Sequence, residues 1–481
     1  MHFDRCKVVA AGIIQVLFAI QAAAGAPVAD AGSVEQLPKL ALGEVLLVAD
    51  DVYSASNKNR ESHVDDQGQS AQAEELFQRA RKACGQGEVD TAMRYAARVL
   101  AADPDHHEAR QLLGYLSVGD SWGGGYAARR FERGEIWNPR FGWLRAEDLQ
   151  RWKADERPLG KRWITLEEDT RRHRTIEDGW RLRTDHFEIV TNHSREAAAE
   201  LAAQVETLYR VWQQLFGDFY LAKSDLLRRL DQKKVSGHRR QPFSVVYYRS
   251  RDQYNSALRS QQPRIDITLG IYFDTTRKSH FFAEPQQNPG TLYHEAVHQF
   301  FQESGRSAKK VGALGNAWAI EGVACYFESL MNLPREEQSG LGPSGAGRFF
   351  TIGTASAGRL PAARHRRLID DYYVPLAELS PMGTSDLQQR EDLAQLYTQS
   401  AGLATFFMHY QDGIYRKQFG ELLRLLYTGR DTPGKLSELV GVGYPQLDRQ
   451  YREFMEHLTM PPATHRTSPD GSPSLRANLV N

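Results

Sequence analysis

The 481-residue sequence has only three cysteines, no excess of either charge and no long apolar run beyond its N-terminus. So few cysteines exclude the disulfide framework of a small stapled scaffold. Lys+Arg and Asp+Glu both total 60, so the charge balance gives no indication of binding to nucleic acid or to an anionic membrane. The length instead predicts a globular protein of roughly three units.

The N-terminus is typical of a secretory signal peptide. Arg5 and Lys7 form a basic region, residues 8–20 are apolar, and residues 22–26 offer small side chains for cleavage, preferably after Ala24. The apolar stretch is too short to span a membrane; the alternative is a buried N-terminal helix. We expect residues 1–26 to be a signal peptide and the mature protein to be secreted or periplasmic, with no membrane span. Cys6 leaves with the signal. Cys84 and Cys325 could pair, but because their contexts predict separate helices we expect two independent buried thiols.

Composition and periodicity divide the first half of the mature chain into three segments. Residues 27–72 are polar and predict a disordered leader. Residues 73–117 predict helices that resemble one tetratricopeptide-type hairpin, with an ordinary helical hairpin as the alternative. Because one such repeat cannot bury its own apolar face, it is expected to pack on the next domain or on a protein partner. Residues 118–178 form a Trp- and Arg-rich connector of small strands and turns.

The second half predicts an α+β domain over residues 179–460. Strands are expected over 180–191, 243–248, 268–273 and 280–282, with helices over 196–216 and 251–258. After Gly290 only helices are expected, and a small sheet followed by helices is the order of an α+β fold. Residues 461–481 are rich in Pro, Ser and Thr and predict a disordered tail.

The sequence His294-Glu295-Ala296-Val297-His298 is an HExxH motif within an apolar segment. Residues four apart lie on one face of a helix, so the two imidazoles can bind one tetrahedral zinc ion. Glu295 lies beside that face, where a carboxylate can act as general base on a water molecule. The alternative is a surface helix with two unrelated histidines.

A third metal ligand is predicted 23 residues further on, at Glu321 in the apolar segment WAIEGVACYFE. A carboxylate in an apolar setting is costly unless it is paired or bound to a metal; the alternative is a capped or salt-bridged residue. Glu328, two turns later, could accept a hydrogen bond from a ligand histidine and orient its ring. Cys325 is expected to be a core residue and not a ligand.

The segments HEAVHQFF and WAIEGVACYFE resemble the gluzincin pattern of zinc peptidases. They are similar to the aminopeptidase N family and to peptidase-MA-like domains of secreted bacterial proteins. The resemblance implies a gluzincin-like fold, one Zn²⁺ per chain bound by His294, His298 and Glu321, and a peptide or protein substrate. Tyr397 lies in YTQSAG, which resembles the segment whose tyrosine stabilises the oxyanion in aminopeptidase N-like enzymes. The alternative is that Tyr397 is a packing aromatic.

The resemblance has one clear departure. The Gly-x-Met-Glu-Asn segment that binds a free amine in aminopeptidase N-like enzymes is absent, because residues 270–274 read GIYFD. Aminopeptidase specificity is therefore not expected. The sequence predicts a secreted zinc peptidase, and leaves two alternatives open: a non-catalytic binding or scaffold protein on the same fold, and a zinc hydrolase with a cell-wall or ester substrate.

Overall fold

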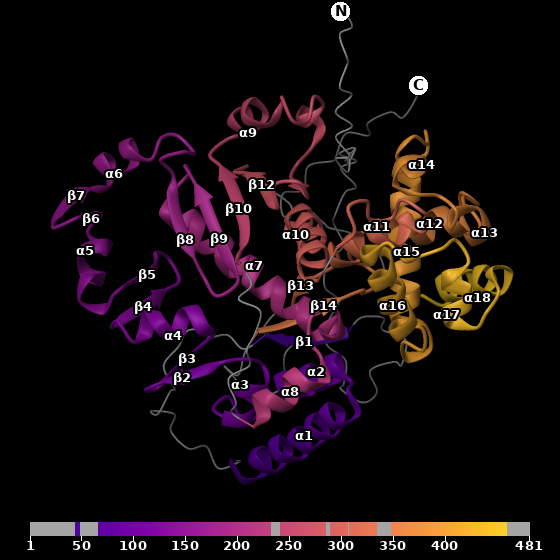
Figure 1. Ribbon diagram of the computed structural model, residues 1–481, viewed down its shortest axis with the longest axis horizontal. Coiled ribbons are helices and arrows are strands. Elements are labelled where there is room, and N and C mark those ends of the chain that lie inside the picture. Colours follow the sequence, from indigo (N-terminus) through magenta and orange to yellow (C-terminus); the bar gives the residue numbers. More distant parts are fainter. Residues whose placement is uncertain are drawn as a thin grey trace, which may run out of the picture.

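The computed structural model describes residues 44–48, 66–231, 241–284, 289–305, 307–333 and 348–458. It combines many helices with small sheets, in agreement with the predicted α+β class (Figure 1). The expected signal peptide (1–26) and tail (461–481) lie outside the described residues. Within the described ranges, no helix combines the length and apolarity that crossing a membrane requires.

The predicted N-terminal helices are present as α1 (Asp66–Gln86), α2 (Val89–Ala102) and α3 (His107–Leu112). A fourth helix, α8 (Lys223–Leu230), comes from much later in the chain and lies beside them (Figure 1). The four helices share one apolar cluster, which includes Phe77, Met93, Leu100, Leu112 and Leu226. The hairpin thus covers part of its apolar face with a helix of the downstream region.

The connector folds as three β-hairpins, each followed by a short helix. The units are β2–β3–α4 (Leu116–Val118, Ser121–Gly123, Gly125–Phe131), β4–β5–α5 (Glu135–Asn138, Gly142–Arg145, Leu149–Lys153) and β6–β7–α6 (Glu156–Leu159, Arg162–Thr165, Leu166–Arg172). A tryptophan occupies the second position of each second strand: Trp122, Trp143 and Trp163. The regular spacing of these tryptophans is a repeat signal that the sequence analysis overlooked.

A five-stranded mixed sheet has the order β11-β12-β10-β9-β8. Its strands are β8 (Trp180–Arg183), β9 (Phe187–Thr191), β10 (Phe243–Tyr248), β11 (Ile271–Phe273) and β12 (Lys278–Phe282). The expected single strand over 180–191 is wrong, because a turn divides it into β8 and β9. Asp185 in that turn accepts hydrogen bonds from the backbone N–H groups of Gly124, Tyr126 and Ala127 at the start of α4. The strand expected over 268–273 is limited to its last three residues.

Two helices pack near this sheet as expected, α7 (Arg195–Leu215) and α9 (Arg251–Leu258). The helix α10 (Pro289–Glu303) packs against both the sheet and α7. Its Phe300 is fully buried, with ring centroids 5.9 Å from Phe187 of β9 and 5.1 Å from Tyr209 of α7. These aromatic contacts fix α10 beside the sheet.

A second sheet corrects two expectations. It consists of β1 (Glu44–Val48), β14 (Arg348–Ile352) and β13 (Met331–Asn332) in the order β1-β14-β13. Residues 27–72 therefore do not form a wholly disordered leader, since they contain β1 and the first turns of α1. Nor is the chain after Gly290 only helical. Both strands depend on partners far away in the sequence, which no local pattern reveals.

The last third of the chain forms a layer of helices on the right of Figure 1. It contains α11 (Ala317–Phe327), α12 (Leu360–Leu368), α13 (Leu376–Leu379), α14 (Thr384–Gln388), α15 (Leu393–His409), α16 (Arg416–Thr428), α17 (Lys435–Val440) and α18 (Tyr444–His457). The helices α11 and α15 approach so closely that a Cβ atom on Gly322 would lie 2.6 Å from the carbonyl oxygen of Ser400. Cys84 and Cys325 are both free and buried, as expected.

Candidate metal centre

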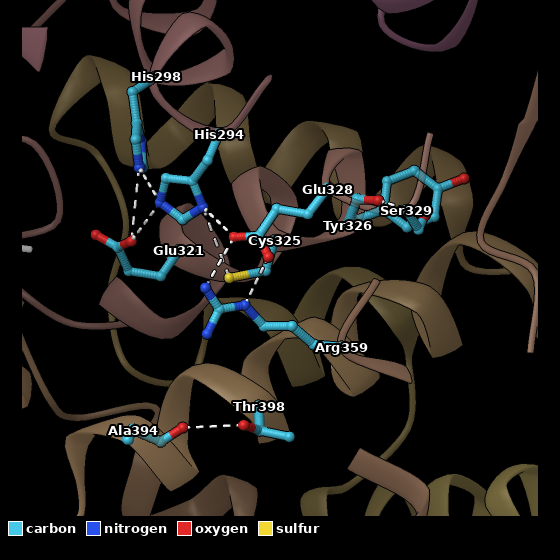
Figure 2. A network of polar contacts seen from close by, with 10 residues as sticks. All are labelled: His294, His298, Glu321, Cys325, Tyr326, Glu328, Ser329, Arg359, Ala394 and Thr398. Carbon is cyan, nitrogen blue, oxygen red and sulfur yellow. Dashed lines mark hydrogen bonds and ion pairs between the residues drawn. The ribbon is translucent and has the colours of Figure 1, made fainter. Parts of the chain in front are cut away.

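The candidate site lies where α10 meets α11. His294 and His298 project from α10 one turn apart, and Glu321 projects toward them from α11 (Figure 2). All three side chains are almost completely buried, with 1%, 3% and 4% of their residue surfaces exposed. The structure therefore brings the three predicted ligands together in the interior.

The ligand atoms converge on one point. His294 Nε2 lies 3.1 Å from His298 Nε2 and 3.4 Å from Glu321 Oε2, and His298 Nε2 lies 3.5 Å from the same oxygen. Ligands bound tetrahedrally to zinc at 2.0–2.2 Å are separated by about 3.4 Å. The three described side chains thus have the chemistry and the spacing of a cation site before any ion is considered.

The charges in this cluster depend on one another. Burial alone would raise the pKa of Glu321, but His298 and His294 hold it well below its usual range. Burial lowers the pKa of His298. For His294 the burial effect is outweighed by Cys325, Glu321 and Glu328, which raise its pKa well above 6.5. Glu321 is therefore ionised between the two imidazoles, and a carboxylate must be ionised to bind a metal.

Glu295 lies next to the cluster and not within it. One carboxylate oxygen, Oε2, accepts a hydrogen bond of 3.0 Å from the backbone N–H of Tyr272 on β11, the edge strand of the large sheet. The other oxygen, Oε1, is buried and has no hydrogen-bond partner in the described part of the chain. Burial, despite the opposing effect of His294, raises the pKa of Glu295 to about 8. The carboxyl group can therefore exchange a proton near neutral pH.

Behind the ligands, Glu328 contacts His294 on the ring edge opposite the cluster. Glu328 Oε1 lies 2.8 Å from His294 Nδ1. The same carboxylate accepts hydrogen bonds from Arg359, with Nε to Oε2 at 2.7 Å and Nη2 to Oε1 at 3.0 Å (Figure 2). Burial would raise the pKa of Glu328, but Arg359 and His294 lower it to about 2. This contact between Glu328 and His294, a predicted ligand, agrees with the expectation from the sequence.

Tyr397 reaches the site from α15. Its ring stacks on that of His294, with centroids 6.4 Å apart and an interplanar angle of 18°. Only 5% of the residue is exposed, and burial together with the charge of Glu321 raises the pKa of the phenol well above 10. The phenol therefore stays protonated and is available as a hydrogen-bond donor at the candidate metal site.

Cys325 is buried with its Sγ 3.8 Å from His294 Nδ1. With His294 and Glu328 it forms a second group of side chains that could bind a metal. Burial raises the pKa of the thiol, which disfavours the thiolate that a metal would need. Glu328 in this group is also already bonded to the cation of Arg359. These contacts place Cys325 among the packing residues of the site.

Two contributors to the site, Arg359 and the backbone N–H of Tyr272, were not predicted from the sequence. Neither lies within a metal-binding motif, and both reach the site only through the folding of distant segments. No protein-family model matches the chain, and no curated protein sequence matches it. The function must therefore be argued from the site itself.

Proposed function

We propose that this protein is a zinc-dependent peptidase of the gluzincin type, with one Zn²⁺ held by His294, His298 and Glu321. The observation that supports this most strongly is the convergence of His294 Nε2, His298 Nε2 and Glu321 Oε2 at mutual distances of 3.1–3.5 Å in a buried site. Two imidazoles and a carboxylate are a common zinc ligand set in hydrolases, in which a further coordination position stays open. Zinc held there supplies Lewis-acid polarisation of a carbonyl group and of a water molecule.

The protein groups have distinct roles in this proposal. Glu295 takes a proton from the attacking water and passes it to the leaving amine, for which a pKa near the working pH is well suited. The Tyr397 phenol donates a hydrogen bond to the oxyanion that forms at the substrate carbonyl. Glu328 holds the ring of His294. The N-terminal helices α1–α3 are proposed to be a tetratricopeptide-like element that serves a protein partner.

The proposed substrate is a peptide or protein outside the cytoplasm. The features of residues 1–26 support a signal peptide and a secreted or periplasmic location. The absence of a Met-Glu-Asn segment before α10 argues against a requirement for a free amino terminus. The proposal therefore concerns hydrolysis of peptide bonds, with no preference for chain ends.

The test begins with the zinc content of the purified chain lacking residues 1–26. We expect roughly one zinc per chain, lost in His294→Ala and Glu321→Ala and kept in His365→Ala, since His365 is exposed on α12. The same proteins are then assayed on an unfolded polypeptide. We expect Glu295→Gln to keep its zinc but to lose at least 100-fold in cleavage rate.

Three outcomes would count against the proposal. A wild-type protein that binds no zinc after refilling would exclude the metal centre. Zinc binding without cleavage of any polypeptide would favour a binding or scaffold protein. Cleavage of esters or cell-wall glycans alone would indicate a different hydrolase.

A further inference from the structure

We propose that Arg359 is a positioning residue of the metal centre, which holds Glu328 and, through Glu328, the imidazole of His294. The inference rests on the proposed function, because it assigns His294 as a metal ligand. Arg359 lies 38 positions beyond Glu321, outside both the HExxH motif and the WAIEGVACYFE segment. The contacts, the charges and the backbone around Arg359 each support it.

The hydrogen bonds form a continuous path. Arg359 donates to both oxygens of Glu328, at 2.7 and 3.0 Å, in the two-point geometry that fixes the plane of a carboxylate. Glu328 Oε1 also lies 2.8 Å from His294 Nδ1. An ionised carboxylate only accepts, so Nδ1 must be the donor. In the neutral ring this leaves the lone pair on Nε2, the atom that faces His298 and Glu321.

The positive charge of Arg359 is needed as much as its geometry. Glu328 and Glu321 are two carboxylates on one short segment, and both contact His294. Only 14% of the Glu328 side chain is exposed, so its charge needs a partner. Arg359 supplies that partner. Without it, the buried carboxylate would lose the two donors that fix its plane against His294.

The backbone before Arg359 is shaped to bring it to this position. Gly358 has a φ of +56°, and a Cβ atom there would lie 3.0–3.1 Å from the backbone and Cβ of Ser329. Ser329 follows Glu328 directly, and its hydroxyl accepts a 2.8 Å hydrogen bond from the N–H of Gly353. The segment that carries Arg359 is thus held against the end of α11, where Glu328 lies. This close approach requires glycine at position 358.

Arg359 also touches the other side of the site. Its Cζ atom lies 5.9 Å from the centroid of the Tyr397 ring. The ring of Tyr397 in turn stacks on His294. One guanidinium therefore contacts both the carboxylate that orients His294 and the phenol proposed to bind the oxyanion.

The test measures zinc affinity directly, by competition with a chromophoric chelator. We expect Arg359→Met to weaken zinc binding about tenfold, at the lower end of the range for residues behind a ligand. Arg359→Lys keeps the charge but not the two-point contact, so we expect an intermediate loss. The matched control is Arg364→Met on α12, the helix that begins directly after Arg359. Arg364 donates to the carbonyl oxygen of Met455, away from the site, and its loss should leave zinc affinity unchanged.

A double-mutant cycle shows whether Arg359 acts through Glu328. We expect Glu328→Gln combined with Arg359→Met to bind zinc no more weakly than Glu328→Gln alone. Far-UV circular dichroism and the melting temperature of each metal-free variant check that the fold is retained. If Arg359→Met binds zinc as tightly as wild type, or if the two losses simply add, the inference is wrong. A wild-type protein without zinc would instead refute the proposed function.

Discussion

Replacement of Glu295 by glutamine should stabilise the metal-free protein at alkaline pH. The carboxyl group is buried and its pKa is raised from 4.5 to about 8. Folding therefore favours the protonated form, and stability is lost as the pH rises from about 4.5 toward 8. At about 1.4 kcal/mol per pH unit, this shift costs the ionised protein roughly 4–5 kcal/mol. Glutamine carries no charge and can still accept the hydrogen bond from the N–H of Tyr272.

The assay is urea denaturation of chelator-treated proteins at pH 5 and pH 9, followed by tryptophan fluorescence. We expect the gain from Glu295→Gln to be about 4 kcal/mol larger at pH 9 than at pH 5. Glu200→Gln is the control, because Glu200 is exposed on α7. Its effect should stay within about 0.5 kcal/mol at both values.

The reasoning would be refuted if Glu295→Gln had the same effect on stability at both pH values, or if it destabilised the protein at pH 9. Either result would mean that the carboxyl group is solvated or paired in the metal-free protein. The expected result would instead show an ionisable group buried at the expense of stability, as is common at active sites.

Three further predictions concern stability and the shape of the site. His186 and Arg210 outweigh the effect of burial and lower the pKa of Glu206 to about 2. Glu206→Gln should therefore lower the free energy of unfolding by about 3 kcal/mol at pH 7, and by less as the pH falls from 4.5 toward 2, as measured by urea denaturation. Phe301→Ala removes a fully buried ring of α10 and should cost about 3–5 kcal/mol in the same assay; a cost under 1 kcal/mol would contradict the packing. Gly322→Ala should push α11 from α15, lowering both the melting temperature and zinc affinity; unchanged zinc affinity would show that Glu321 tolerates the shift.

The sequence predicted the elements whose signals are local. The periodicity of α7 and α9 gave bounds within one residue, and HExxH placed His294 and His298 on one face of α10. Glu321 was identifiable because a carboxylate inside an apolar helix is costly. Its proximity to the histidines is now described, whereas zinc binding and catalysis remain predictions.

The missed features depend on distant segments. The short apolar pattern of β1 predicts a strand only once its partner β14 is known. Nothing in the sequence distinguishes Arg359 from the other arginines, and only the turn at Gly358 brings it to Glu328. The turn at Asp185 serves to cap α4, about 60 residues earlier, so nothing near it in the sequence signals a break in the strand.

The pairing of β1 with β14 has a consequence for the order of folding. Glu44 lies opposite Ile352, and the same glutamate contacts Arg94 at 3.5 Å and Arg416 at 3.0 Å. The first described strand thus has no strand partner until the chain has grown by about 300 residues, which takes roughly 15–60 s at the usual rates of synthesis. Loop closure over such a span is entropically costly. Pairing of β1 with β14 should therefore be a late event that joins distant parts of the chain.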